Sequence, residues 1–318
     1  MATQQVGRAP RNRSVFLDGP ERERLLESTI GLSSPIAIEQ LADTTIHQDL
    51  FQVIPHLPDQ FVDLLIVDPP YNLSKKFGDT KFKQTSEADY EAWFYSWFSQ
   101  IVRCLKPTAS IYVCCDWQTT HVVRNVLRQF LTVRNRITWE REKGRGAKSN
   151  WKNCSEDIWF CTVSDEYHFD ADAVMVKRRV IAPYRGIDGL PKDWHEENGN
   201  KYRLTSPSNL WTDISVPFWS MRENTAHPTQ KSEKLVAKLI LASSRAGDFV
   251  FDPFLGSGTT SVVSRKLGRH YVGVERESEY CAYAIKRLES AAHDPSIQGL
   301  QGGHFWERNS KPNQGDLW

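Results

Sequence analysis

Short apolar runs alternate with segments of helical periodicity along much of this chain, and the alternation strongly limits how it can fold. Residues 62–67 form an apolar run that stops at two prolines, which cannot continue a central strand. Residues 87–105 then carry apolar side chains every three or four positions, the spacing of one helix face. Further alternation predicts strands at 109–115, 133–139, 248–254 and 270–275 and helices at 121–130, 231–244, 259–267 and 278–291. Strands alternating with helices are typical of parallel β-α-β units, so we expect a Rossmann-like α/β domain with a mostly parallel sheet.

The composition is that of a globular protein and excludes several other classes. Of the 318 residues 40% are hydrophobic, and 40 Lys plus Arg stand against 39 Asp plus Glu, a formal net charge of +1. That balance neither demands nor excludes a polyanionic partner. No apolar run approaches the ~18 residues of a membrane-spanning helix, and the first residues lack the apolar core of a secretory signal. The six cysteines form no CxxC pair, so we expect no metal site and a reduced, cytoplasmic setting.

A glycine-containing turn at 249–260 has the layout of a ligand-binding loop. Gly256 and Gly258 follow an expected strand and precede an expected helix, so the backbone there can turn sharply and approach a ligand closely. Thr259 or Thr260 can cap that helix. Glu275 ends the next strand, 19 residues after Gly256, where an acid can accept hydrogen bonds from ribose hydroxyls. The loop has neither a third glycine nor a GK[ST] sequence, so a nucleoside cofactor without phosphates, S-adenosylmethionine above all, fits best.

The segment Asp68-Pro69-Pro70-Tyr71 follows the expected strand 62–67 and therefore lies at a strand's carboxyl end, where open α/β sheets bind ligands. The prolines stiffen the backbone and offer carbonyls, Asp68 adds an acceptor, and Tyr71 adds a flat ring. This set suits a planar ring with an exocyclic amine. Two acceptors on the amine hydrogens favour a tetrahedral nitrogen whose lone pair can attack a methyl on a sulfonium. Methylation of cytosine carbon 5 is disfavoured because it needs a thiolate nucleophile, and no Pro-Cys pair occurs.

Four motifs in one order now point to a family. They are Asp68–Leu73, His227–Lys231, Asp252–Thr260 and Gly273–Glu275. In this order the chain resembles the amino-group DNA methyltransferases of the permuted β class, which make N6-methyladenine or N4-methylcytosine from S-adenosylmethionine. The resemblance implies a class I methyltransferase fold with an inserted DNA-recognition region, in an enzyme of restriction–modification systems. It favours adenine, because members with aspartate before the two prolines mostly methylate adenine, while N4 of cytosine stays the alternative. Ser232 stands where the family usually has proline, and serine can cap a helix there.

The resemblance also implies roles for single residues. The catalytic segment would be Asp68, Pro69, Pro70 and Tyr71. The cofactor would be held by Asp49, His227, Pro228, Thr229, Asp252, Phe254, Gly256, Ser257, Gly258, Thr259 and Glu275.

The region 142–225 differs from the rest in being rich in Trp, Asn, Lys and Arg, with weak periodicity. Its basic clusters suit contact with a phosphate backbone, and Arg and Asn read base edges. We expect double-stranded DNA as the partner, with the target base flipped out of the helix. RNA or a small molecule as substrate, and a DNA-binding protein without catalysis, are the alternatives. The expected contact residues are Arg141, Lys143, Arg145, Lys148, Asn150, Trp151, Lys152, Lys177, Arg178 and Arg179.

These patterns divide the chain into five expected segments. They are an N-terminal extension at 1–40, a catalytic half at 41–141, a target-recognition region at 142–225, a cofactor-binding half at 226–292 and a tail at 293–318. We expect the tail to be poorly ordered because it is rich in Gly, Asn and Gln. The oligomeric state stays open, with a homodimer as one possibility.

Overall fold

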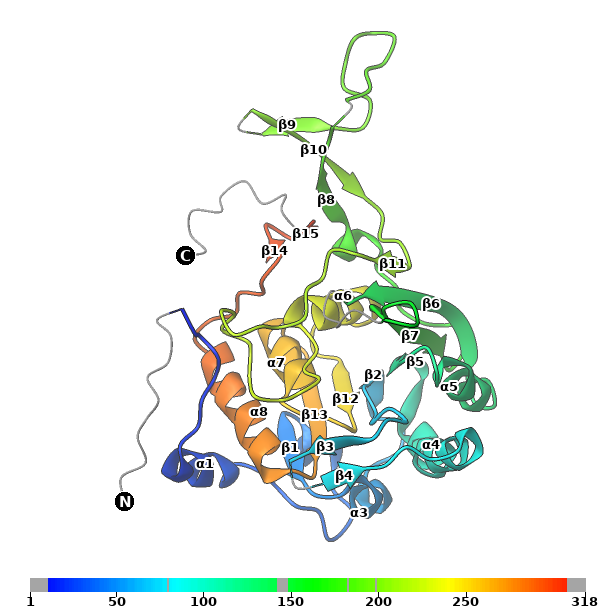
Figure 1. Cartoon of the computed structure of the whole chain (residues 1–318), viewed down its shortest axis with the longest axis vertical. Helices are drawn as coiled ribbons and strands as arrows, with labels where there is room; N and C mark the ends of the chain where they lie inside the picture. The colour runs from blue at the N-terminus through cyan, green and yellow to red at the C-terminus, as the bar shows by residue number, and fades with distance from the viewer. Residues whose placement is uncertain (1–10, 79, 142–147, 182, 198, 308–318) are drawn as a thin grey trace.

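The computed structural model describes residues 11–78, 80–141, 148–181, 183–197 and 199–307. Within them, a central sheet of eight strands organises the molecule (Figure 1). In order across the sheet these are β1 (Thr44–His47), β13 (His270–Glu275), β12 (Phe249–Asp252), β2 (Val62–Val67), β5 (Leu105–Cys115), β7 (Ser155–Thr162), β6 (Thr132–Glu140) and β11 (Leu210–Trp211). Only β7 runs antiparallel to its neighbours. The expected α/β fold with a mostly parallel sheet is therefore confirmed.

Helices cover both faces of this sheet. They are α1 (Gly19–Leu26), α2 (Ile38–Leu41), α3 (Leu50–Val53), α4 (Glu87–Ile101), α5 (Thr120–Leu127), α6 (Glu233–Ser243), α7 (Thr259–Lys266) and α8 (Ser278–Ala291). Strand β2 shows why two layers form, since its successive residues point to opposite faces. Leu65 packs into the same core as Trp97 of α4, while Leu64 packs into the core that contains Leu239 of α6. Figure 1 accordingly shows α4 and α5 on one side of the sheet and α7 and α8 on the other.

Several element boundaries differ from the sequence prediction by one to four residues, and two of them are instructive. The helix expected over 87–105 ends at Ile101, and the single turn Val102–Cys104 leads into β5. Leu105 is buried as expected, but as the first residue of that strand. Helix α6 begins one residue after Ser232, whose hydroxyl accepts a hydrogen bond from the Leu235 N–H at 3.3 Å. Serine therefore does cap this helix.

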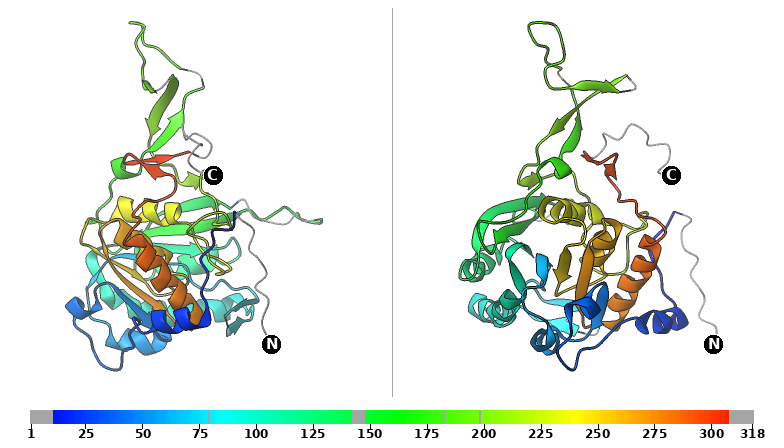
Figure 2. Two further views of the ribbon diagram at one scale, coloured as in Figure 1. Left: turned by 90° about the vertical axis from the view of Figure 1, so that its left-hand side faces the viewer. Right: turned by 180° about the vertical axis from the view of Figure 1, so that it is seen from behind.

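A second sheet of five strands stands on top of the central one in Figures 1 and 2. Its order is β14 (Leu300–Gln301), β15 (His304–Trp306), β8 (Val176–Arg179), β10 (Asn200–Thr205) and β9 (His195–Glu197). The expectation of a poorly ordered tail is wrong for 300–306, because β15 pairs with β8 and Phe305 is fully buried. Residues 308–318 lie outside the described part of the chain.

The region predicted for target recognition contributes to both sheets. β7 and β11 belong to the central sheet, while residues 163–209 leave it and carry β8, β9 and β10 (Figure 1). A separate hairpin of β3 (Lys75–Phe77) and β4 (Thr80–Phe82) follows the Asp-Pro-Pro-Tyr segment. In the described residues no helix is long and apolar enough to cross a membrane.

Candidate active site

The carboxyl ends of three neighbouring parallel strands meet at one cavity. Asp68 follows β2, the glycine turn follows β12, and Glu275 ends β13. Because these strands are parallel neighbours, their carboxyl ends lie at the same edge of the sheet. The cavity has a volume of about 280 Å³, and residues 68–71 and 252–257 both line it. The structure thus brings together the two segments that the sequence singled out.

The glycine turn is held in shape by Asp252 and by close packing. The Asp252 carboxylate accepts hydrogen bonds from the Phe254 N–H at 3.0 Å and the Thr260 hydroxyl at 2.6 Å. Gly258 has φ of +82°, and a Cβ added to it would lie 2.5 Å from the Ala284 Cβ. Residues that carry a side chain rarely adopt that backbone conformation, so only glycine fits at this position. The prediction that Thr259 or Thr260 caps α7 is wrong, because Gly258 is the N-cap residue of this helix.

Glu275 organises the turn from the neighbouring strand. Its carboxylate accepts hydrogen bonds from the Gly256 and Glu277 N–H groups, both at 2.8 Å. Burial raises the pKa of Glu275 to about 7, and burial also raises the pKa of Asp252 to about 7. A carboxylate that lines a cavity at the end of a strand can accept hydrogen bonds from a ribose diol. The site therefore fits the nucleoside part of a cofactor.

The turn that precedes α6 closes the cavity from another side. The His227 ring packs edge-to-face on Tyr280 at 4.4 Å, and a Cβ on Gly256 would lie 3.0 Å from its Nε2. Burial, together with the nearby Lys231 and Lys75 charges, lowers the pKa of His227 to about 3, so the ring is neutral. Because Gly256 has no side chain, the neutral His227 ring lies close to its backbone in the wall of the cavity.

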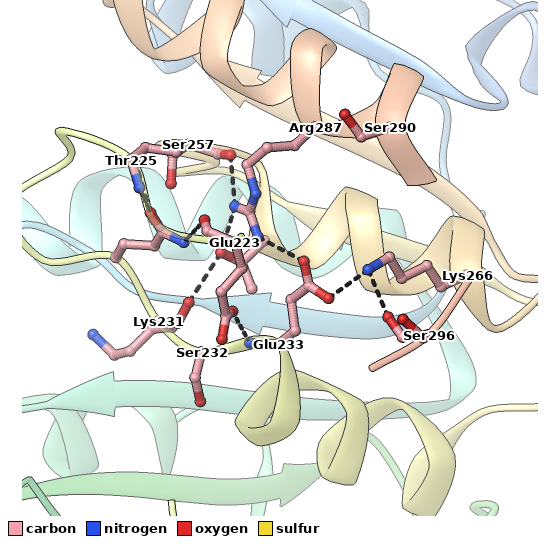
Figure 3. Close-up of polar contacts among 12 residues, drawn as sticks. Glu223, Thr225, Lys231, Ser232, Glu233, Ser257, Lys266, Arg287, Ser290 and Ser296 are labelled. Atoms are coloured by element: carbon pink, nitrogen blue, oxygen red, sulfur yellow. Dashed lines mark hydrogen bonds and ion pairs between the residues drawn. The ribbon is translucent and has the colours of Figure 1, made fainter. Parts of the chain in front are cut away.

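Arg287 of α8 ties this turn to the glycine turn (Figure 3). Its guanidinium donates to the Ser257 carbonyl at 2.8 Å and the Thr259 hydroxyl at 3.0 Å, and it pairs with Glu233 at 3.1 Å. The Thr259 hydroxyl in turn donates to the Lys231 carbonyl at 3.1 Å. These contacts fix both turns relative to α8.

Asp68 and Tyr71 lie in a network of charged side chains. The Tyr71 hydroxyl lies 3.0 Å from Asp68 Oδ1 and 3.1 Å from Glu156 Oε2, and the Lys231 ammonium donates to Asp68 Oδ2 at 2.6 Å. Arg141 pairs with the other oxygen of Glu156. The Pro70 carbonyl accepts a hydrogen bond from Tyr90 at 3.0 Å.

Sequence reasoning assigned no role to two members of this network. Lys231 ends the His227–Lys231 motif, and its spacing from α6 gives no sign of contact with Asp68, which lies 163 positions away. Glu156 lies in β7, just before the apolar run Ile158–Cys161, and an acid beside such a run was the available signal. Both become neighbours of Asp68 only through the order of strands in the sheet.

The cofactor residues inferred from the family resemblance mostly line the cavity. Those that line it are Asp49, His227, Thr229, Asp252, Phe254, Gly256, Ser257, Thr259 and Glu275. Pro228 is exposed and does not line the cavity, and Gly258 packs behind the turn on α8. Asp49 caps α3, with its carboxylate accepting from the Phe51 N–H at 3.0 Å. Among the described residues, no group of three or more His, Cys, Asp and Glu side chains could hold a metal ion.

The residues expected to contact DNA differ in where the structure places them. Lys148, Asn150, Trp151 and Lys152 are exposed on the connection between β6 and β7, with Trp151 93% exposed. Arg141 lines the cavity instead, and Lys143 and Arg145 lie outside the described residues. Lys177 contradicts the expectation, because it is buried, pairs with Glu197 at 2.5 Å and lies over the Trp306 ring. Arg178 pairs with Glu307 at 3.5 Å, while Arg179 is exposed.

Comparisons with known proteins agree with this geometry. The sequence profile of a family described as DNA methylase, N6_N4_Mtase, matches residues 62–286. The DNA adenine methyltransferase YhdJ of Escherichia coli (strain K12) is 33% identical over 255 residues, covering 79% of this chain and 84% of that protein. The type II methyltransferase M.HpaI of Haemophilus parainfluenzae is 31% identical, covering 75% of this chain and 72% of the relative.

Solved structures show the same fold. The M1.HpyAVI–SAM complex aligns with a TM-score of 0.51 and 24% identity, over 77% of this chain and 98% of that one. The cytosine-N4-specific PvuII DNA methyltransferase aligns with a TM-score of 0.57 and 16% identity, over 79% of this chain and 92% of that one. The predicted class I methyltransferase fold is therefore confirmed, and the chain belongs to the N6_N4_Mtase family of DNA methylases.

Proposed function

We propose that this DNA methyltransferase transfers a methyl group from S-adenosylmethionine to the exocyclic N6 of adenine in double-stranded DNA, in the cytoplasm and as part of a restriction–modification system. The observation that carries the proposal is the single cavity shared by residues 68–71 and 252–257. A methyl group can pass between donor and acceptor only if both are held within van der Waals reach. The shared cavity supports the proposal, because both segments border the same space.

The residues around the glycine turn fit the cofactor. Glu275 would accept hydrogen bonds from the ribose hydroxyls, and Phe254 would pack against the methionine portion. Asp49 would lie near the amino group of the cofactor's adenine, while His227 and Thr229 would reach the cofactor's amino-acid end. When bound, S-adenosylmethionine would supply a methyl on a positively charged sulfur. The amine lone pair would form the N–C bond, the C–S electron pair would stay on sulfur, and the proton lost by nitrogen would pass to the Asp68 carboxylate or to water.

Asp68 and the prolines prepare the amine for attack. The lone pair of adenine N6 is delocalised into the ring, so the nitrogen is a poor nucleophile until its hydrogens are held out of the ring plane. Asp68 would accept one hydrogen. The Pro69 carbonyl would accept the other, while the Pro70 carbonyl accepts a hydrogen bond from Tyr90. The Tyr71 ring lines the cavity and offers a face for stacking of the flipped base.

The identity of the methylated base can be tested directly. Incubation of the protein with DNA and labelled S-adenosylmethionine, followed by digestion and mass spectrometry of the nucleosides, should give N6-methyladenosine in its deoxy form. The adenine specificity named for the Escherichia coli relative favours this outcome. N4-methyldeoxycytidine would support the alternative base, and transfer to RNA alone would contradict the assignment of DNA as the substrate.

The connection between β6 and β7 is the surface that we propose for DNA. It leaves the sheet at the same edge as Asp68, because β6 runs parallel to β5 and β2 while β7 returns antiparallel. Lys148 and Lys152 are exposed there. Trp151, which is 93% exposed, offers a ring for stacking on an unpaired base.

Reversing these two charges should weaken DNA binding without changing the chemistry. For Lys148→Glu with Lys152→Glu, we expect the plot of log affinity against log salt to become less steep. The magnitude of its negative slope should decrease by about 2, since each phosphate contact contributes about 0.9. Arg128→Glu, an exposed position after α5 at the opposite edge of the sheet, is the matched control. An unchanged salt slope in the double variant would remove this surface from the proposal.

A further inference from the structure

Lys231 lies in direct contact with Asp68, a residue of the proposed catalytic segment. Its ammonium lies 2.6 Å from Asp68 Oδ2, 3.2 Å from Glu156 Oε2 and 3.4 Å from the Tyr71 hydroxyl. The Lys231 side chain is only 9% exposed and that of Glu156 only 5%. Both oxygens of Asp68 are therefore already engaged, Oδ2 by Lys231 and Oδ1 by Tyr71.

The arrangement is asymmetric in a way that suits the entry of an amine. The ammonium touches two carboxylates, so it keeps one partner when the amino group of a base binds at Asp68 Oδ2. Glu156 is in turn held by Arg141 on its other oxygen. A lysine without Glu156 would have to leave the buried site or compete with the amine for Asp68. Glu156 thus holds the Lys231 ammonium in the buried site while the amine binds at Asp68.

The charges also decide whether Asp68 can accept a hydrogen. Burial and the Glu156 carboxylate raise the pKa of Asp68, and Lys231 opposes them. Burial lowers the pKa of Lys231, but the Asp68 and Glu156 carboxylates raise it by more than burial lowers it. The net pKa is raised, so the ammonium stays charged. The other ionisable groups that act on Asp68 are Tyr71, Tyr90, Cys114, Lys75 and Asp252. Burial raises the pKa of both tyrosine hydroxyls and of the Cys114 thiol, so these three remain neutral. Burial lowers the pKa of Lys75 and raises that of Asp252 to about 7. Lys231 is then the charge that most favours an ionised Asp68.

We propose that Lys231 is a positioning residue for methyl transfer: held by Glu156, its ammonium keeps the Asp68 carboxylate ionised and oriented to receive the amino group of the target base. This inference rests on the proposed function, since it concerns how the same pocket prepares the amine. It assigns Glu156 as the anchor of Lys231. Neither residue need touch the cofactor for this role.

Three variants test the proposal through the pH profile of single-turnover methyl transfer to DNA, measured at saturating S-adenosylmethionine so that the titration of Glu275 in cofactor binding does not set the acidic limb. Lys231→Met should lower the rate at neutral pH by about 100-fold, the loss expected from a misplaced catalytic group. It should also move the acidic limb to higher pH, because Asp68 then keeps its proton longer. Lys231→Arg retains the charge and should recover most of the rate. Lys266→Met, which removes a pairing lysine of matched 10% exposure outside the cavity, should lower the melting temperature without moving the limb.

The double variant Lys231→Met with Glu156→Gln separates positioning from a merely structural role. Without the lysine, Glu156 only repels Asp68, so removing its charge should bring the acidic limb part of the way back and raise the rate above that of Lys231→Met. Glu156→Gln alone should move the limb to lower pH. Each variant is first checked for folding by its melting temperature, and Glu156→Gln keeps the test available if Lys231→Met does not fold.

Two results would overturn the proposal. One is an acidic limb that stays in place in Lys231→Met; the other is a double variant that is slower than Lys231→Met. Either result with an active wild-type protein rejects the role of Lys231 and leaves the proposed function standing. A wild-type protein that transfers no methyl group to DNA rejects the proposed function itself.

Discussion

Replacing Asp68 with alanine should lower the rate of methyl transfer by about 10³-fold while leaving the affinity for S-adenosylmethionine within a few-fold of wild type. The expected loss follows from removing a preorganised acceptor at the reacting nitrogen, where a single such group contributes about 10²- to 10³-fold. The Asp68 carboxylate takes no part in the hydrogen bonds from the Gly256 and Glu277 N–H groups to the Glu275 carboxylate, which shape the cofactor site. Single-turnover kinetics with labelled cofactor and calorimetric titration of S-adenosylmethionine measure the two quantities separately.

A matched control distinguishes chemistry from the loss of any acidic side chain. Asp165 follows the far end of β7, at the edge of the sheet opposite the cavity, and its side chain is 91% exposed. Asp165→Ala should therefore keep the wild-type rate. Retention of more than a tenth of the rate in Asp68→Ala would show that the amine is prepared elsewhere.

Replacing Glu275 with alanine should weaken binding of S-adenosylmethionine by about 100-fold. Two hydrogen bonds from ribose hydroxyls to a carboxylate contribute about 3 kcal/mol together, which corresponds to about two powers of ten in affinity. The Gly256 and Glu277 N–H groups would lose their acceptor in the same variant. Isothermal titration calorimetry measures the change, with Glu39→Gln on the exposed face of α2 as the control. An affinity within threefold of wild type would contradict the ribose assignment.

The same carboxylate makes cofactor binding depend on pH. Burial raises the pKa of Glu275 to about 7, so its proton is bound below that pH in the cofactor-free protein. Ribose hydroxyls donate to the ionised form, and affinity should therefore fall about tenfold per pH unit below 7 and level off above it. Glu275→Gln removes this titration. The other buried carboxyls whose pKa is raised to about 7 in the same way are Asp252 and Glu223, so any dependence that remains in Glu275→Gln is expected from them.

The fold and the two ends of the site follow from local patterns. Alternating strands and helices place the carboxyl ends of β2, β12 and β13 at one edge, so the sequence alone assigns Asp68, Gly256 and Glu275 to one region. Spacing is enough for such residues because Asp68 and the glycine turn come just after their strands and Glu275 ends its own.

The parts that could not be predicted depend on strand order and on burial. Glu156 reaches Asp68 because β7 returns antiparallel beside β5, and local periodicity carries no information on that order. Lys177 has the pattern of a surface charge in the sequence, yet β15 returns from the end of the described chain and places Trp306 against it. Phe305 has no periodic partners in its glycine-rich surroundings, so its burial was hidden as well.

A crystal structure with bound S-adenosylhomocysteine, the product of the donor, tests the central claim most directly. The account predicts ribose hydroxyl oxygens within about 3 Å of the Glu275 carboxylate and the sulfur turned toward Asp68 across open cavity. A nucleoside bound away from Glu275, or a sulfur separated from Asp68 by the protein chain, would contradict it.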